Sequence, residues 1–136
     1  MLNKKDFVIQ QVVMLSAAHS DIEVAWLYGS RARNTHNQKS DYDLAIAFKN
    51  FIADPLDSRL RPELLASNWQ HIIGSSCLQI KLSVIDINLA PIALCYTVLV
   101  DDKPLYIANE MRKLQEENRI MSQWELDYEY SRKKYH

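Results

Sequence analysis

The sequence predicts an α/β (α+β) fold in which a small mixed β-sheet is flanked by helices and followed by a long C-terminal helix. In two segments, 22–28 and 42–48, large apolar residues recur at every second position, and most of the residues between them are apolar too. Apolar side chains on both faces are typical of strands in a covered sheet. Helical spacing of apolar residues precedes the first strand and recurs after the second. A charged helical pattern then occupies the last part of the chain.

The N-terminal third predicts a helix and two strands around a polar loop. Asn3 is a plausible N-cap for a helix over residues 4–19. The first strand, 22–28, runs into Gly29, and the polar residues 31–40 form a loop or a short helical turn before the second strand, 42–48. This arrangement brings the loop to one end of the sheet.

The middle of the chain predicts one helix and one strand. Residues 51–58 have no clear period, and Pro62 suits the first turn of a helix that residues 74–76 end. The next segment, 79–87, is rich in β-branched and apolar residues and is predicted to be a strand.

The last third predicts two helices separated by a turn and a short strand. Asn88 is a candidate cap for a helix over residues 89–100. Residues 101–104 form a turn, and 105–107 a short edge strand. From about residue 108 to 134 we expect one long charged helix.

That long helix has an apolar stripe that includes Trp124 and Tyr128. One interpretation is that the stripe packs back on the domain. The other is that these two residues, with Tyr135, form a surface for a partner protein, because aromatic residues are enriched in the centres of interfaces.

Length and composition indicate a single globular domain without a basic surface. The chain has 136 residues, 48% of them hydrophobic, and a net charge of −1. Tight binding to nucleic acid is therefore not expected. Cys77 and Cys95 lack metal-ligand spacing and are expected to be reduced core residues. Neither a signal peptide nor a membrane span is visible, which predicts a cytoplasmic protein.

The most informative feature is a pair of carboxylates, Asp41 and Asp43, at the start of the second strand. Alternate residues of a strand point the same way, so the two side chains share a face. Adjacent carboxylates repel unless a cation lies between them. Mg²⁺ suits such a pair, since it is commonly held by one or two carboxylates together with substrate phosphates.

A turn at Gly29 and Ser30 precedes this pair, with ten residues between Ser30 and Asp41. The glycine allows close approach of the backbone to a ligand, and neighbouring N–H groups can face an anion. Ser30 and its N–H are candidate contacts for β- and γ-phosphates; Arg33, and more weakly Arg31, could neutralise a triphosphate. Either half of the motif alone is common, but together they predict a site for a metal-bound nucleotide.

The pattern of Gly-Ser, ten residues and Asp-x-Asp resembles the signature of DNA polymerase β-like nucleotidyltransferases, here residues 29–33 and 40–44. It is most similar to the minimal nucleotidyltransferase (MNT) proteins, which often act as antitoxins beside a HEPN-type RNase toxin. The resemblance spans roughly residues 5–107. It implies a minimal nucleotidyltransferase domain over 1–107 and a separate C-terminal helix over 108–136. Asn34 stands where the family more often has glycine, a mild departure because asparagine tolerates left-handed angles.

The resemblance also implies a third catalytic carboxylate on a later strand. If Leu82 and Val84 match the flanking apolar residues of the family, Ser83 replaces that aspartate. Asp86 is the alternative candidate, but three residues further on it belongs to the opposite face of a regular strand. Capping the following helix is its competing role.

Three functions follow from the resemblance. The first is a Mg²⁺-dependent adenylyltransferase that moves AMP from ATP to a tyrosine of a HEPN toxin and so neutralises it. The second is an inactive antitoxin that acts by binding alone. The third is a small-molecule nucleotidyltransferase, although no second acceptor-binding domain is visible in 136 residues.

Overall fold

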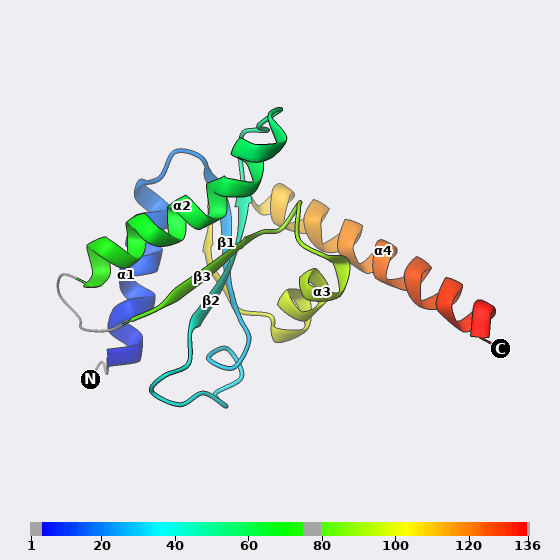
Figure 1. Ribbon diagram of the computed structural model, residues 1–136, viewed down its shortest axis with the longest axis horizontal. Helices are drawn as coiled ribbons and strands as arrows, with labels where there is room; N and C mark the ends of the chain where they lie inside the picture. Colours follow the sequence, from blue (N-terminus) through cyan, green and yellow to red (C-terminus); the bar gives the residue numbers. More distant parts are fainter. Residues whose placement is uncertain (1–3, 75–79, 136) are drawn as a thin grey trace.

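The computed structural model describes residues 4–74 and 80–135, which form a sheet with helices on both sides (Figure 1). In chain order the elements are α1 (Lys4–Ala18), β1 (Ile22–Tyr28), β2 (Tyr42–Phe48), α2 (Pro55–Gly74), β3 (Leu82–Asp86), α3 (Ile92–Asp101), β4 (Pro104–Ile107) and α4 (Glu110–Tyr135). The predicted combination of a small sheet, flanking helices and a long C-terminal helix is confirmed.

The sheet is mixed and has the strand order β3-β2-β1-β4. β1 pairs antiparallel with both β2 and β4, whereas β2 pairs parallel with β3. The central strands β1 and β2 therefore place the loop between them, residues 29–41, at one end of the sheet, which is the end that bears the predicted site.

Both faces of the central strands are covered. On one face Leu44 and Ile46 of β2 pack with residues of α1 and α2, and on the other Ala45 and Ala47 belong to a second core that includes α3 and α4. All four side chains are fully buried. Alternate residues of one strand thus serve two cores, which explains why β2 is apolar at consecutive positions from Leu44 to Phe48.

The helix α2 starts earlier than the sequence suggested. Residues 55–58 were expected to be irregular, with a helix from Pro62, but the helix begins at Pro55. The Asp54 carboxylate accepts the Asp57 N–H at 2.9 Å and satisfies a first-turn donor, while Pro55 occupies the favoured first position. Pro62 lies inside the helix instead of at its start.

The helix α3 begins later than predicted. A start at residue 89 with Asn88 as cap was expected, but α3 begins at Ile92. The preceding residues form a turn in which the Asp86 carbonyl oxygen accepts the N–H groups of Leu89 and Ala90, each at 3.0 Å. Pro91 then provides the transition into the helix.

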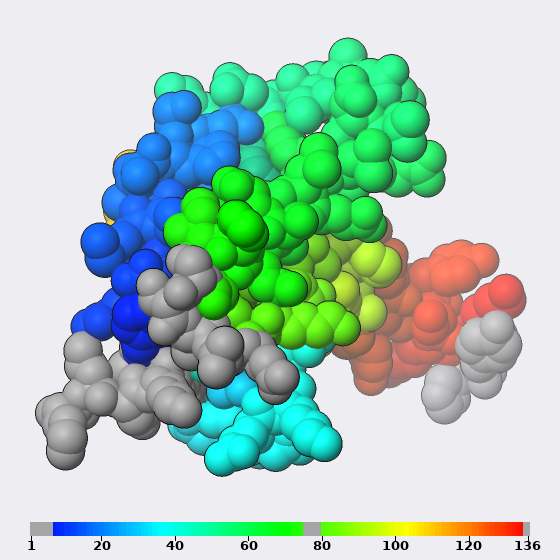
Figure 2. Space-filling model, turned by 60° about the vertical axis from the view of Figure 1, so that its left-hand side comes forward, coloured from blue at the N-terminus to red at the C-terminus, as the bar shows by residue number. Residues whose placement is uncertain are grey.

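The helix α4 divides into a packed and a projecting part. Ile120 is fully buried in the core between α3 and the sheet, and Trp124 stacks on Tyr96 of α3 with ring centroids 4.3 Å apart. Beyond this contact Tyr128 and Tyr130 are exposed, and the helix extends away from the domain (Figures 1 and 2). The side chain of Tyr135 lies outside the described residues.

Arg112 anchors the start of α4 to the sheet. Its guanidinium donates to the Glu23 carboxylate at 2.9 Å, the Phe48 carbonyl at 2.8 Å and the Asn88 side chain at 2.6 Å. The same guanidinium donates to Glu116 one turn further along α4, at 2.9 Å. One side chain therefore connects α4 to both central strands.

Cys95 is buried and free, as predicted, and lies against the Ile87 carbonyl. Cys77 and the expected helix end at Ser75 and Ser76 lie outside the described residues. None of the helices within the described ranges combines the length and the apolar character needed to cross a membrane.

Candidate nucleotide-binding site

The two carboxylates of the motif lie together at the start of β2. Asp41 directly precedes the strand and Asp43 is its second residue, so both belong to the α3 and α4 face. Burial, and then the charge of Asp41, raise the pKa of Asp43 above its usual value, while Arg33 lowers it. Lys81 reaches Asp41 only at 4.0 Å and is largely exposed, so it neutralises the pair weakly.

This donor set fits a divalent cation that is shared with a phosphate ligand. Two neighbouring carboxylate side chains supply hard oxygen ligands, and their repulsion would be relieved by a bound cation. Among residues 4–74 and 80–135, no group of three or more His, Cys, Asp or Glu side chains is arranged to hold a metal ion. Two carboxylates leave the remaining coordination positions of an ion to water and phosphate oxygens.

Gly29 is required where it stands, immediately against Asp43. Its φ angle is +81°, in the region that side chains disfavour, and a Cβ atom would lie 2.5 Å from Asp43 Oδ2. The backbone of the loop and the carboxylate can approach this closely only because residue 29 has no side chain.

The loop after Gly29 is a compact turn. The Arg33 N–H donates to the Gly29 carbonyl at 3.1 Å and the Thr35 N–H to the Ser30 carbonyl at 2.9 Å. Asn34 has a φ angle of 60°, so the left-handed conformation that the sequence allowed for this residue is present. These bonds keep Ser30, which is half-buried, at the mouth of the turn.

Arg31 shapes the loop from within. Its side chain is buried, and the guanidinium lies 4.0 Å from the centroid of the Tyr42 ring. It donates to the Ser40 carbonyl at 3.0 Å and more distantly to the Asn37 carbonyl at 3.4 Å. These contacts connect the two ends of the loop, whereas the sequence had suggested a weak phosphate contact.

Arg33 has the opposite environment and a partner that the sequence analysis missed. Its guanidinium is half exposed and lies 3.4 Å from both carboxylate oxygens of Asp101, the last residue of α3. Asp101 also accepts the Gly29 N–H at 2.8 Å. The sequence alone places Asp101 in a turn, and the available signal for another role is that an acidic residue at a helix C-terminus opposes the helix dipole.

The sheet register places Ser83, and not Asp86, beside Asp43. Tyr28, Asp43 and Ser83 form one row across β1, β2 and β3, while Asp86 is level with Ile46. Asp86 therefore lies three residues further on and on the face covered by α1 and α2.

The carboxylate of Asp86 has structural partners there. It accepts the Asn88 N–H at 2.9 Å and lies 3.4 Å from the guanidinium of Arg61 in α2. The structure thus does not bring Asp86 to the pair of Asp41 and Asp43, and its contacts agree with the competing role at the start of the turn before α3.

Tyr28 is a neutral neighbour of the pair. Burial, followed by the charges of Asp43 and Cys95, raises the pKa of Tyr28 to about 12. Its phenol therefore stays protonated at neutral pH and is unsuited to act as a base.

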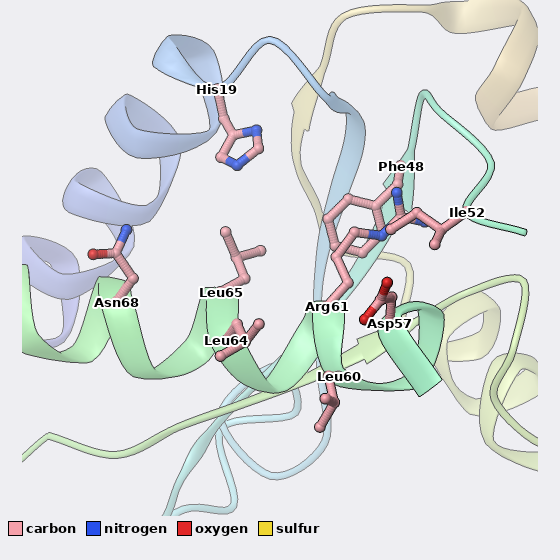
Figure 3. Close-up of a pocket in the computed structure, with 9 residues that line it drawn as sticks. All are labelled: His19, Phe48, Ile52, Asp57, Leu60, Arg61, Leu64, Leu65 and Asn68. Carbon is pink, nitrogen blue, oxygen red and sulfur yellow. The ribbon is translucent and has the colours of Figure 1, made fainter. Parts of the chain in front are cut away.

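A pocket of about 470 Å³ lies at the other end of the sheet (Figure 3). Phe48, the last residue of β2, and Arg61, Leu64 and Leu65 of α2 contribute to its largely apolar wall. Because Asp43 is at the opposite end of β2 and on the other face, this pocket is separate from the carboxylate site. Figure 2 shows the corresponding separation between the loop near residue 40 and the segment after residue 50.

The fold and this site define a nucleotidyltransferase of the polymerase β type. The family model described as polymerase beta, nucleotidyltransferase matches residues 10–111. The chain therefore belongs to this family, in agreement with the motif of residues 29–33 and 40–44.

Solved structures with the same fold come from toxin–antitoxin complexes. A chain in a toxin–antitoxin crystal structure with AMP-PNP is 20% identical with a TM-score of 0.62, over 93% of this chain and 92% of that one. A chain of the MntA-HepT complex is 15% identical with a TM-score of 0.61, over 88% and 86%. A chain from the tri-AMPylated Shewanella oneidensis HEPN toxin in complex with its MNT antitoxin is 15% identical with a TM-score of 0.62, over 89% and 87%. No curated protein matches the sequence.

Proposed function

We propose that this chain is an antitoxin that transfers AMP from Mg²⁺-ATP to a tyrosine of a HEPN-type RNase toxin. The observation that supports this most is the Asp41–Asp43 pair beside the Gly29–Ser30 turn, on a fold shared with chains of toxin–antitoxin complexes. One of those complexes contains AMP-PNP and another a tri-AMPylated HEPN toxin, which motivates the choice of nucleotide and acceptor.

In this proposal Asp41 and Asp43 hold the metal, and the turn holds the triphosphate. Ser30, through its hydroxyl and N–H, contacts the β- and γ-phosphates, and Arg33 offsets their charge. Bound Mg²⁺ would supply charge neutralisation at the phosphates. Because Gly29 has no side chain, the turn lies directly against Asp43, and phosphates held by the turn would be beside the carboxylates.

The reaction exchanges the phosphoanhydride bond between the α- and β-phosphates of ATP for a phosphate ester bond to tyrosine. The tyrosine oxygen of the partner forms a bond to the α-phosphorus, and the bond from that phosphorus to the oxygen it shares with the β-phosphorus breaks, so that this oxygen leaves with pyrophosphate. The phenolic proton must leave as the new bond forms. Ser83 lies beside Asp43 but has a hydroxyl in place of a carboxylate, and the Tyr28 phenol stays protonated. Neither side chain can therefore act as the base that takes this proton. We infer that a group of the partner or solvent receives the proton.

The projecting half of α4 is the proposed docking surface for the partner. Trp124 packs on Tyr96 and contributes to the domain itself, but Tyr128 lies beyond that contact and is 56% exposed. The first half of the helix thus packs on the domain, and docking is proposed for the projecting half.

Binding without catalysis is the alternative function, and Ser83 is the observation that favours it. A chain without a carboxylate in that row could neutralise its partner by covering it. Changing Asp41→Ala together with Asp43→Ala separates the two functions: an enzyme loses neutralisation, whereas a binding antitoxin keeps it. Cell growth during expression of the toxin measures the outcome.

The enzymatic proposal is tested by incubating the chain and its HEPN partner with labelled ATP and Mg²⁺. We expect label on the partner, none with the double variant, and none when EDTA is added. Absence of label with active preparations of both proteins would sink the proposal. Turnover of an aminoglycoside by the chain alone would instead favour a small-molecule nucleotidyltransferase.

A further inference from the structure

Asp101 combines two features that are individually unfavourable. Its carboxylate is 3% exposed, and it stands at the C-terminal end of α3, where the helix dipole disfavours negative charge. Violations of local rules of this kind occur mainly at functional or strained sites. The groups that offset the buried charge of Asp101 therefore indicate what this residue does.

Its partners are the first residue of the phosphate-binding turn and the exposed arginine of the same loop. The Gly29 N–H donates to Oδ2 at 2.8 Å, which is a short charge-assisted hydrogen bond. Arg33 lies at 3.4 Å from each oxygen and is half exposed, so its contact is the longer and weaker one. The bond to Gly29 is the stronger restraint.

Gly29 is thereby held between two carboxylates. Its Cα faces Asp43, where a Cβ would come within 2.5 Å of the carboxylate, and its N–H faces Asp101. Rotation of the peptide before Gly29 would break the bond to Asp101. The orientation of the turn relative to Asp43 thus depends on α3, an element that is distant in the sequence.

The base of α3 is itself fixed to the same strand. The Lys103 carbonyl, two residues after Asp101, accepts the Leu27 N–H at 2.9 Å, two residues before Gly29. Asp101 is consequently supported by a backbone contact between the two segments and cannot move far from the turn.

We propose that Asp101 is a positioning residue for nucleotide binding: it holds the Gly29 peptide so that the Ser30 N–H and hydroxyl face the triphosphate beside Asp41 and Asp43. This proposal rests on the nucleotide-binding role of the turn given above. The weaker contact keeps Arg33 near the site and releases it to the phosphates when they bind.

The opposite role for Asp101 predicts the opposite change in nucleotide affinity. If Asp101 were a competitor that occupies the loop in place of phosphate, removing its charge would strengthen nucleotide binding. If it positions the loop, removing the hydrogen-bond acceptor weakens binding even though a negative charge near the triphosphate disappears.

Three variants distinguish these roles. Asp101→Ala removes the acceptor, whereas Asp101→Asn keeps an oxygen that can accept the Gly29 N–H but removes the charge. Asp102→Asn is the matched control, because this neighbouring residue is exposed and asparagine tolerates its left-handed φ of 49°. Calorimetry with Mg²⁺-AMP-PNP measures affinity, and NMR measures amide exchange at Gly29 in the nucleotide-free protein.

We expect the affinity of Asp101→Ala to fall about tenfold or more, since a hydrogen bond to a charged group is lost. Asp101→Asn should fall between this variant and the wild type, and Asp102→Asn should match the wild type. Exchange at Gly29 should accelerate in Asp101→Ala and stay slower in Asp101→Asn.

Unchanged or tighter nucleotide binding by folded Asp101→Ala would overturn the proposal. If that variant does not fold, tighter binding by Asp101→Asn than by the wild type has the same consequence. If the wild type binds no nucleotide, the proposed function fails instead. Amide exchange then decides about Asp101: acceleration in the alanine variant supports its hold on Gly29, and unchanged exchange overturns it.

Discussion

Gly29 and Asp43 are coupled by shape, because the glycine leaves room for the carboxylate. The glycine has a φ of +81°, and the space beside its Cα is filled by the Asp43 side chain. Burial and the charge of Asp41 raise the pKa of Asp43, because both disfavour its charged form. This is the energetic cost of placing two carboxylates together where a cation would bind. Two variants test these statements separately.

Changing Gly29→Ala should lower both stability and nucleotide affinity. The added Cβ would meet Asp43 Oδ2 at 2.5 Å, and a left-handed angle for alanine costs about 1–3 kcal/mol. Thermal melts and calorimetry with Mg²⁺-AMP-PNP measure the two effects. The control is Gly74→Ala, where nothing lies within 4 Å of the new atom. Equal behaviour of the two variants would contradict the importance of this close approach.

Changing Asp43→Asn should stabilise the metal-free protein at pH 7. The folded protein holds the Asp43 proton more tightly than the unfolded chain, so the associated stability is complete below the usual pKa of 3.8 and is lost as the pH rises through the raised value. The gain over wild type should therefore disappear as the pH falls below about 4. Melts across this range check it, and a destabilised variant at pH 7 would show that the carboxylate is structural.

For single residues of the site, the sequence predicted which ones lie close together but not which contacts each one makes. Gly29, Ser30, Asp41 and Asp43 have a characteristic spacing in the sequence, and the structure brings them to one end of the sheet. Asp101 could not be found in that way, because its contact with Gly29 spans α3 and the sheet.

The two halves of α4 have different environments: the first packs on the domain, and the second is exposed. Arg112 and Ile120 attach its first half to the sheet and core, and Trp124 ends that attachment by stacking on Tyr96. The apolar period predicted the helix, but could not show where its contact with the domain ends, because exposure depends on the position of α3.

We expect the two aromatic residues of this helix to have different effects. Trp124→Ala should reduce stability by about 1–3 kcal/mol, since it removes a half-buried ring and its stacking on Tyr96. Tyr128→Ala should change stability by less than about 0.5 kcal/mol and weaken binding of the toxin. Denaturant unfolding and calorimetry with the partner measure these effects. Unchanged partner affinity of folded Tyr128→Ala would remove this residue from the docking surface.

Arg112→Met should destabilise the protein by about 2–4 kcal/mol at pH 7, because Glu23, the Phe48 carbonyl and Glu116 lose a shared donor. Lys113→Met is the control, since its pair with Glu117 lies within one helix face. A loss equal to that of the control would refute the anchoring role.

The effect of Arg112→Met should also depend on pH. Burial alone would raise the pKa of Glu116, but hydrogen bonds from Asn88, Arg112 and Arg119 outweigh it and leave the pKa below its usual 4.5. The stability that Glu116 contributes is present above 4.5 and is lost as the pH falls through the lowered value. Melts should show the variant and wild type converging in that acid range.

The predicted starts of α2 and α3 were wrong for a related reason. The α2 segment has a proline at two possible starting positions, Pro55 and Pro62, and the α3 segment can begin after Asn88 or at Pro91. The choice depends on contacts that the sequence does not specify. Asp54 caps α2 at Pro55, and the Asp86 carbonyl holds a turn before α3.

In the molecule as a whole, the ends of the sheet have different characters. The loop and carboxylates occupy one end, on the side of α3 and α4, and the apolar pocket lies at the other end beside α1 and α2. The projecting half of α4 lies on the side of the sheet where α3 packs (Figure 1), and Asp43 belongs to that same face by its place in β2. Under the proposed function, a partner docked on the projecting half of α4 would thus be on the face of the sheet that bears the carboxylates.

The most direct test is the intact mass of the HEPN partner after co-expression with this chain. We predict that the partner gains the mass of one or more AMP units with the wild type. With Asp41→Ala and Asp43→Ala combined, it should keep its unmodified mass, while the control Asp102→Asn should modify it as the wild type does. An unmodified partner that is nevertheless neutralised by the wild type would contradict AMP transfer and establish inhibition by binding.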